Sequence, residues 1–214
     1  MNFLAHFHTT NKNILPYKLL GLALPDVARD FSRIYNKKLE SGLSTNKTYI
    51  LEMLEGIELH IKGDDLFHNH RIFKSNELFA KEVLEDEKGI SVKRKFVIAH
   101  VIIELMIDQY IINYFPEELE RFYKRLEPID ILKANELFEI LDISEEKSNF
   151  IQNFSHFRKN KFLYHLKENE GVLLTLDKVF GTIFAYNFVE NTDVWMKAIE
   201  KIKLNLQKEL PFLL

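Results

Sequence analysis

Apolar side chains recur three and four residues apart along most of the chain, the spacing that gathers them on one face of an α-helix. No strand-like alternation of useful length appears, and the chain has only 7 glycines. No Pro/Gly/Ser-rich linker divides it. The sequence therefore predicts an all-α fold, a single compact multi-helix domain over residues 1–214. The predicted helical segments are 49–62, 78–84, 96–115, 117–126, 131–141, 146–166, 172–186 and 194–206.

Prolines and serines indicate where some of these helices begin and end. Pro25 is expected near a helix start, and Pro116 is expected to separate two helices. Ser91 and Ser144 are expected to be N-caps, because a serine hydroxyl can accept a hydrogen bond from a free N–H of the first turn.

Composition narrows the function classes. The chain has 214 residues, 46% of them hydrophobic and 29% charged, which is typical of a folded domain with a substantial core. Cysteine is absent, so disulfides, thiolate metal sites and cysteine nucleophiles are excluded. A net charge of −3 provides no basic field for nucleic acid or membrane binding, and we expect neither partner. The N-terminal residues do not resemble a signal peptide, so we expect a cytoplasmic location.

The segment 96–115 is apolar enough to suggest a membrane span, yet it carries His100, Glu104 and Asp108 at intervals of four residues. Each carboxylate near the centre of a span would cost ~2.5–3.5 kcal/mol, which argues against a membrane helix. The stripe is therefore either the solvated face of a core helix or a face turned toward positive charge. A solvated face usually carries lysine as well, and residues 96–112 contain neither Lys nor Arg.

The spacing of His60 and Asp64, and of Glu104 and Asp108, favours a metal site. Residues four apart lie one turn apart on the same helix face, so two side chains can reach one ion. Imidazole and carboxylate ligands suit Mn, Fe, Mg or Zn ions. Two such helices packed face to face would bring four ligands together. Without metal, the carboxylates are expected to repel one another, so Asp64→Asn should be tolerated by the fold.

Other histidines have simpler interpretations. His8 and His156 flank apolar residues and are expected to be core-edge histidines with one hydrogen bond. His68 and His70 can equally mark the exposed end of a helix.

Four blocks of sequence resemble the acyl carrier protein phosphodiesterases, a family distantly related to the HD-type metal phosphohydrolases. The chain opens with MNFLAH, and the second block is GLALPDVARD. The third block begins GIELH, and the fourth has two acidic residues four apart on an apolar helix. The residues that carry the resemblance are Gly21, Asp26, Arg29, Gly56, Ile57, Leu59, His60, Asp64, His70, Glu104 and Asp108.

The resemblance implies an HD-domain-like fold and a hydrolase that releases 4′-phosphopantetheine from holo acyl carrier protein, an enzyme of fatty acid metabolism. It implies a divalent ion, Mn²⁺ first, with Mg²⁺ or Fe²⁺ as alternatives. The expected ligands are Asp26, His60, Asp64, Asp108 and His6. Expected catalytic residues are Arg29, which would clamp a phosphoryl oxygen, together with His70 and Glu104. One of His6, His68, His70 and His100 is expected to be a further metal ligand or the acid that protonates the leaving group. The sequence does not select among these four histidines.

The chain departs from the family at several positions. Ile61 stands where the family usually has Arg, His68 where it has Asp, and Gln109 where it has His, while Glu104 replaces the commoner Asp. These departures leave two alternatives open. One is a non-catalytic helical binding protein on the same scaffold, and the other is an HD-like phosphohydrolase that acts on another small phosphoester.

Acyl carrier proteins are acidic, so a docking surface should be locally basic. The segments SVKRKF (Lys93, Arg94, Lys95) and FRKNKF (Arg158, Lys159, Lys161) are the candidates, although each can also be an ordinary solvated helix end. The sequence leaves the oligomeric state open.

Overall fold

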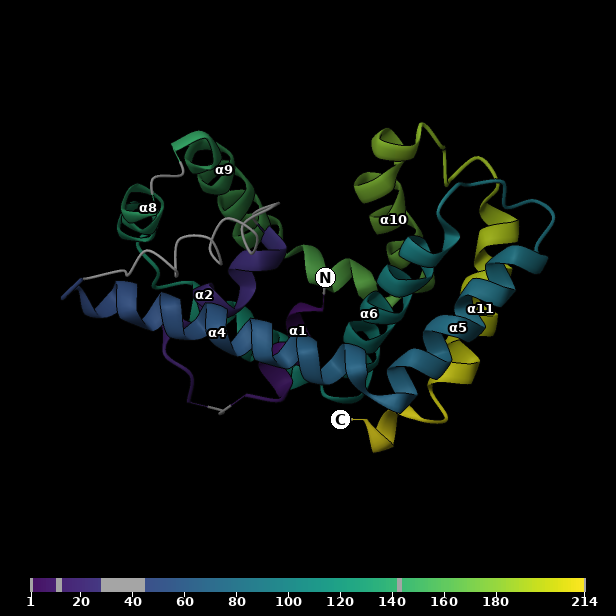
Figure 1. Cartoon of the computed structure of the whole chain (residues 1–214), viewed down its shortest axis with the longest axis horizontal. Coiled ribbons are helices and arrows are strands. Elements are labelled where there is room, and N and C mark those ends of the chain that lie inside the picture. The colour runs from purple at the N-terminus through teal and green to yellow at the C-terminus, as the bar shows by residue number, and fades with distance from the viewer. Residues whose placement is uncertain (1, 11–12, 28–44, 142–143, 214) are drawn as a thin grey trace. The chain divides into compact units, whose positions relative to one another are not determined.

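The computed structural model describes residues 2–10, 13–27, 45–141 and 144–213, in which all regular secondary structure is helical (Figure 1). Strands are absent from these ranges, so the all-α class predicted from the sequence is confirmed. The helices are α1 (Phe3–His8), α2 (Pro16–Val27), α4 (Thr48–Asn69), α5 (Arg71–Asp86), α6 (Lys95–Tyr114), α7 (Pro116–Leu126), α8 (Ile131–Ile140), α9 (Ser144–Asn160), α10 (Asn169–Phe184) and α11 (Thr192–Leu206), with 3₁₀ turns η1 (Phe162–Lys167) and η2 (Leu210–Phe212).

Helix boundaries differ from the prediction where local backbone chemistry decides them. The predicted helix 146–166 is interrupted at Lys161, whose φ of 45° is left-handed, and the chain continues as η1. Pro25 lies inside α2 near its end, so the predicted helix start there is wrong. Ser91 is not an N-cap, because α6 begins after Arg94, itself left-handed at φ 55°. Pro116 does begin α7, as predicted.

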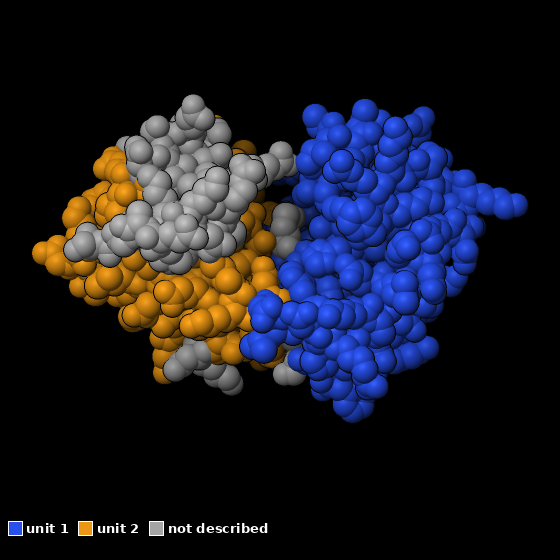
Figure 2. Space-filling model, viewed as in Figure 1, with its two compact units in different colours: residues 1–5, 65–116, 163–214 blue, residues 6–64, 117–162 orange. Residues whose placement is uncertain are grey.

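The helices form two compact units, coloured separately in Figure 2. Unit 1 comprises residues 1–5, 65–116 and 163–214, and unit 2 comprises residues 6–64 and 117–162. Both units are discontinuous in sequence, since the chain passes from one to the other within α1 and again within α4. The sequence-based expectation that residues 1–214 form a single domain stays a prediction.

In unit 1, α6 is the central helix. It packs against α5 and α10, and α11 packs against α5, α6 and α10. Ile98, Ile102 and Ile107 of α6 are completely buried, as is Trp195 of α11. Among the described helices, α6 is the one long and apolar enough to cross a membrane, but 67% of its apolar window is buried inside the protein. That burial is what the core helix of a globular unit shows.

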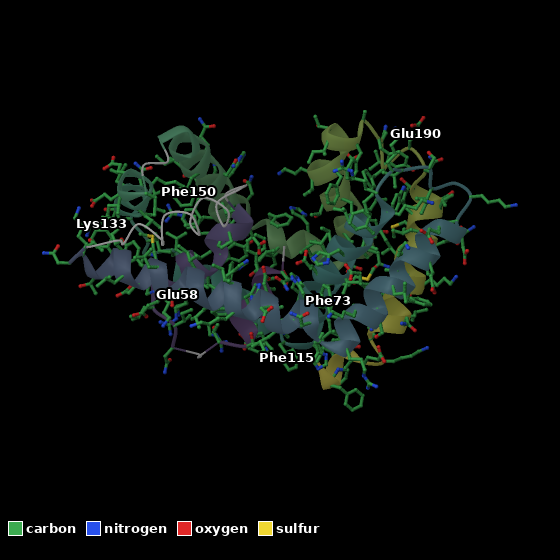
Figure 3. The ribbon with its side chains drawn as sticks, in the orientation of Figure 1. Glu58, Phe73, Phe115, Lys133, Phe150 and Glu190 are labelled. Atoms are coloured by element: carbon green, nitrogen blue, oxygen red, sulfur yellow. The ribbon has the colours of Figure 1, made fainter. Side chains whose placement is uncertain are left out.

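Unit 2 is held by aromatic packing and by a close crossing of α2 and α4. On α8 and α9, the Phe138 and Phe150 rings lie 4.7 Å apart (Phe150 is labelled in Figure 3). At the crossing, a Cβ on Gly21 would lie 2.0 Å from the Met53 carbonyl oxygen, and a Cβ on Gly56 would lie 2.0 Å from the Lys18 carbonyl oxygen. Backbone therefore meets backbone at both glycines, and no side chain fits between the two helices.

We expect Gly56→Ala to destabilise the protein. Neither backbone can yield cheaply at a contact of 2.0 Å, and overpacking of this kind costs ~1–3 kcal/mol. The midpoint of thermal unfolding should fall by about 2–4 °C for each kcal/mol in a chain of this size.

Gly181→Ala is the matched control. Gly181 also lies in a helix, α10, but its added Cβ would meet its nearest neighbour at an ordinary 3.4 Å. Alanine should therefore stabilise α10 by ~0.5–1 kcal/mol through lower backbone entropy in the unfolded chain. If both variants moved the midpoint in the same direction, the close crossing would not govern the effect.

Candidate functional site

Two groups of side chains have the composition of a metal site, one in each unit. The His60 group consists of His6, His60 and Asp64, and the His100 group consists of His68, His100 and Glu104. Within each group, one ligand atom from every residue lies within 4.8 Å of the others. A metal-binding capacity predicted from the sequence is thus supported by geometry, although the identity of the ion is not.

In the His60 group, Asp64 lies between two imidazoles. Its Oδ1 is 3.0 Å from His6 Nε2, and its Oδ2 is 3.2 Å from His60 Nε2. The two rings are tilted against each other with centroids 4.4 Å apart. His6 and His60 are buried, whereas 35% of the Asp64 side chain remains exposed. The group is therefore open to solvent on its carboxylate side.

The orientation of the His60 ring is fixed by a hydrogen bond at Nδ1, the ring nitrogen that does not face Asp64. Its Nδ1 lies 2.9 Å from the Leu22 carbonyl oxygen, and since a carbonyl oxygen only accepts, Nδ1 must carry the proton. Nε2 is then the atom turned toward Asp64. Burial disfavours the charged imidazole, but the hydrogen bond to Asp64 and the negative charge of Asp26 outweigh it and raise the pKa of His60 above 6.5.

Asp64 is stabilised as a carboxylate. Burial alone would raise its pKa, yet the hydrogen bonds from His6 and His60 hold the pKa of Asp64 far below its ordinary value. The expected repulsion among carboxylates is therefore wrong for this residue, because imidazoles dominate its surroundings. The glycine at position 63 leaves room for the His6 ring, since a Cβ there would lie only 2.7 Å from His6 Nδ1.

In the His100 group, Glu104 is the shared acceptor. Its Oε1 lies 3.3 Å from His68 Nε2 and 3.5 Å from His100 Nε2. Only 6% of the Glu104 side chain is exposed, against 30% for each imidazole. Burial alone would raise the pKa of Glu104, but the two histidines help to hold it well below its ordinary value. The polar stripe of α6 is therefore not a solvated face here.

His100 is also oriented from behind. Its Nδ1 donates to Oε1 of Glu77 on α5 at 2.8 Å. The ring of Phe73, labelled in Figure 3, packs 4.9 Å from the His68 ring and 5.3 Å from the His100 ring. The hydrogen bonds to Glu104 and Glu77 raise the pKa of His100.

Asp108 has a structural partner. It is completely buried, and its Oδ1 accepts hydrogen bonds at 2.9 Å from the backbone N–H groups of Leu4 and Ala5. These N–H groups belong to the first turn of α1, where helix geometry leaves donors unsatisfied. Asp108 therefore caps α1. The structure groups it with neither set of imidazoles, and its predicted role as a metal ligand stays a prediction.

The other predicted residues are divided between the groups and the surface. Asp26 lies in the last turn of α2, and its negative charge helps to raise the pKa of His60. His70 is exposed and accepts a hydrogen bond from the Ile72 N–H as the N-cap of α5, as a helix-end histidine would. Arg29 lies outside the described residues. Gln109 is buried and donates to Asn169.

The residues that sequence reasoning missed are the ones that orient the imidazoles. Glu77 was not a candidate, because one Glu on an amphipathic helix gives no signal of its own. The Leu22 carbonyl is a backbone atom and is invisible in the sequence. His68 and His100 were among the alternatives. The four-residue spacing of His100 and Glu104 was a signal for the His100 group, whereas His68 has that spacing from Asp64, which lies in the other group.

Both groups fit a divalent ion. Bonds of ~2.0–2.2 Å place ligand atoms ~2.8–3.6 Å apart around a tetrahedral or octahedral ion. The separations of 3.0 and 3.2 Å in the His60 group, and of 3.3 and 3.5 Å in the His100 group, fall in that range. These carboxylate–imidazole separations are compatible with coordination, and within each group the three ligand atoms lie within 4.8 Å of one another.

Comparisons with known proteins give little functional guidance. No family model matches the chain. The chain is 26% identical over 178 residues to Kelch-like protein 25 of Xenopus tropicalis. The matched region covers 77% of this chain and 25% of that protein. The chain thus spans about a quarter of the length of the curated relative it matches. No solved structure matches. The geometry of the two groups therefore carries the functional proposal.

In metal-free protein kept in EDTA, we expect Asp64→Asn to be destabilising, with a characteristic pH dependence. The lowered pKa of Asp64 contributes stability above pH 3.8 that is lost as the pH falls through the folded value. The raised pKa of His60 contributes stability below pH 6.5 that is lost as the pH rises through its folded value. The difference in urea midpoint between wild type and variant should therefore be largest between these two limits.

Asp65→Asn provides the control, because Asp65 is the next residue of α4 but is exposed, and its Oδ1 accepts a hydrogen bond from the Asn69 amide. Its substitution should change stability by about 0.5 kcal/mol or less. An Asp64→Asn variant as stable as wild type at pH 5–6 would contradict the assigned hydrogen bonds.

Proposed function

We propose that the protein is a metal-dependent phosphodiesterase that releases 4′-phosphopantetheine from holo acyl carrier protein. The observation that supports this most directly is the His60 group. Two buried imidazoles and one partly exposed carboxylate offer ligand atoms within 4.8 Å of one another, and the resemblance of the sequence to acyl carrier protein phosphodiesterases includes all three residues. The proposed cytoplasmic location agrees with such a substrate.

His6, His60 and Asp64 would hold the ion. The ligand role of Asp26 stays a prediction, and its negative charge acts on His60. The proposed ion is Mn²⁺, with Mg²⁺ or Fe²⁺ as alternatives, because imidazole with carboxylate suits these hard or borderline ions. A bound divalent ion supplies acidity to water and neutralises phosphoryl charge.

The chain's own contribution is orientation. The bond from His60 Nδ1 to the Leu22 carbonyl keeps Nε2 turned toward Asp64, and outer bonds of this kind preserve ligand geometry. The resemblance implies that Arg29 acts on the phosphoryl oxygen and His70 on the leaving serine oxygen. Both roles stay predictions, because Arg29 lies outside the described residues and His70 belongs to unit 1, not to the unit that contains the His60 group. His70 is exposed at the start of α5, where a protein substrate can reach it.

The basic segments provide exposed charge for an acidic protein substrate. Lys93 and Arg94 are exposed, whereas Lys95 donates to the Leu84 carbonyl and so helps to end α5. In the second segment, Arg158 donates to the Ile129 carbonyl, and Lys159 and Lys161 are exposed. Two basic residues are thus exposed in each segment, although Lys161 also lies over the Tyr123 ring, with its Nζ 5.9 Å from the ring centroid.

The departures at Ile61, His68 and Gln109 favour keeping two further candidates. A non-catalytic binding protein would use the same scaffold to hold an acyl carrier protein without hydrolysis. An HD-like phosphohydrolase would use the His60 group on another small phosphoester.

The test is to incubate the metal-loaded protein with holo acyl carrier protein and Mn²⁺ and to follow the mass of the carrier protein. Loss of the phosphopantetheine mass supports the proposal. Stable complex formation without mass loss supports the binding protein instead. Hydrolysis of bis(p-nitrophenyl) phosphate with an intact carrier protein supports the alternative phosphohydrolase.

We expect Asp64→Asn to lower the rate of this hydrolysis at least about 100-fold, because even outer-shell changes at metal sites cost ~10–100-fold. Asp65→Asn should keep the wild-type rate. Both variants should be compared at a temperature at which circular dichroism shows them folded, so that the predicted instability of Asp64→Asn does not imitate a loss of activity. Equal rates for Asp64→Asn and wild type would remove the His60 group from the reaction.

A further inference from the structure

We propose that His68, His100 and Glu104 form a second, independent metal site that binds a divalent transition-metal ion in unit 1, with Glu77 as its positioning residue. The proposal does not depend on the phosphodiesterase activity. It rests on side chains of α4, α5 and α6 that lie within unit 1, whereas the His60 group belongs to unit 2.

The first argument is the orientation of His100. A carboxylate only accepts hydrogen bonds, so the 2.8 Å contact between Glu77 Oε1 and His100 Nδ1 places the proton on Nδ1. In neutral His100, Nε2 then carries the lone pair and is turned toward Glu104. A carboxylate behind the imidazole is the usual support of a metal-binding histidine, because it fixes the tautomer and makes the ligating nitrogen more basic.

The second argument is the geometry around Glu104. Both Nε2 atoms approach the same oxygen, Oε1, at 3.3 Å from His68 and 3.5 Å from His100. The longer contact, from His100, is at the 3.5 Å limit of a hydrogen bond. An ion with bonds of ~2.0–2.1 Å in tetrahedral geometry separates its ligand atoms by ~3.3–3.4 Å. The observed separations are close to that value.

The third argument is rigidity. Glu104 is almost fully buried on the core helix α6, and Phe73 packs against the rings of both histidines. Ligands held by packing keep their geometry without an ion, which reduces the ordering cost of binding. Each imidazole is nevertheless 30% exposed, so the point between them can be reached from solvent.

The ligand set indicates the class of metal. Two imidazole nitrogens and one carboxylate oxygen suit Zn²⁺, Fe²⁺ or Co²⁺, whereas Ca²⁺ and Mg²⁺ prefer oxygen alone. Three protein ligands leave a tetrahedral position for water or an exogenous ligand, as in sites that are not purely structural. We therefore assign Zn²⁺ or a similar borderline ion to this site.

The competing explanation is an ion-pair network, in which protonated His100 joins Glu77 to Glu104. Metal binding and this network make opposite demands on His100, since a ligating imidazole must be neutral. In that network both imidazoles would donate to Oε1 of Glu104, which accepts from His68 at 3.3 Å, so a measurement of metal binding separates the two explanations.

Zn²⁺ binding by the full-length Asp64→Asn chain tests the proposal, measured by equilibrium dialysis with elemental analysis. This substitution weakens the His60 group and leaves the second site intact. One Zn²⁺ per chain is expected to remain. Adding Glu104→Gln or His100→Ala should weaken its binding more than ~100-fold, and Glu77→Gln should weaken it ~10–100-fold, because Glu77 acts through His100.

Matched controls are Glu82→Gln and His165→Ala, exposed residues outside both groups, which should bind as the parent does. Co²⁺ in place of Zn²⁺ should give visible d–d absorption that disappears with His100→Ala. If Glu104→Gln fails to fold, His100→Ala at the partly exposed position decides the question. In the wild-type background, Glu104→Gln or His100→Ala should lower the number of bound Zn²⁺ ions by one per chain. This expectation holds whether or not the protein has hydrolase activity.

Two outcomes would overturn the second site. One is an Asp64→Asn chain that is folded by circular dichroism but binds no Zn²⁺. The other is Zn²⁺ binding that neither Glu104→Gln nor His100→Ala weakens.

Discussion

The close crossing of α2 and α4 is the constraint on which the His60 group depends. Gly21 and Gly56 let the two backbones meet without a side chain between them. One residue beyond Gly21, the Leu22 carbonyl is thereby within 2.9 Å of His60 Nδ1, and His60 lies one turn beyond Gly56. Asp64 follows after another turn, and Asp26 lies one turn beyond Leu22. The contact between α2 and α4 thus sets the orientation of the His60 imidazole.

The two groups share one physical design. In each, an imidazole gives its Nδ1 proton to an acceptor behind it, the Leu22 carbonyl for His60 and the Glu77 carboxylate for His100. Nε2 then points toward a carboxylate four residues along the same helix. The difference is in the surroundings, because Asp64 is partly exposed while Glu104 is nearly buried. Exposure suits a group that must meet a substrate, and burial suits one that holds an ion tightly.

Periodicity located α4 to α11, because it reports which face of a helix is apolar, but the predicted segments covered only parts of α4 and α5 and did not include α1 or α2. It failed at Lys161, where a left-handed backbone breaks a continuous apolar pattern. The rule that proline marks a helix start failed at Pro25, which lies inside α2 near its end. Spacing of four residues found the His60–Asp64 pair. Spacing does not show which partner a carboxylate meets, so Asp108 looked like a ligand and lies against the N–H groups of Leu4 and Ala5. Backbone partners and Glu77 are set by tertiary packing, which one sequence does not display.

The most direct test of the central claim, that the oriented imidazoles are metal ligands, is anomalous diffraction from crystals soaked in Mn²⁺ and, separately, in Zn²⁺. The account predicts an anomalous peak within about 2.0–2.3 Å of His60 Nε2 and an Asp64 oxygen, and a Zn²⁺ peak at the corresponding distance from His100 Nε2 and Glu104. Imidazole planes should be unchanged from the metal-free crystal. Soaked crystals without a peak at either group, or with both imidazoles rotated away from their Nδ1 acceptors, would contradict it.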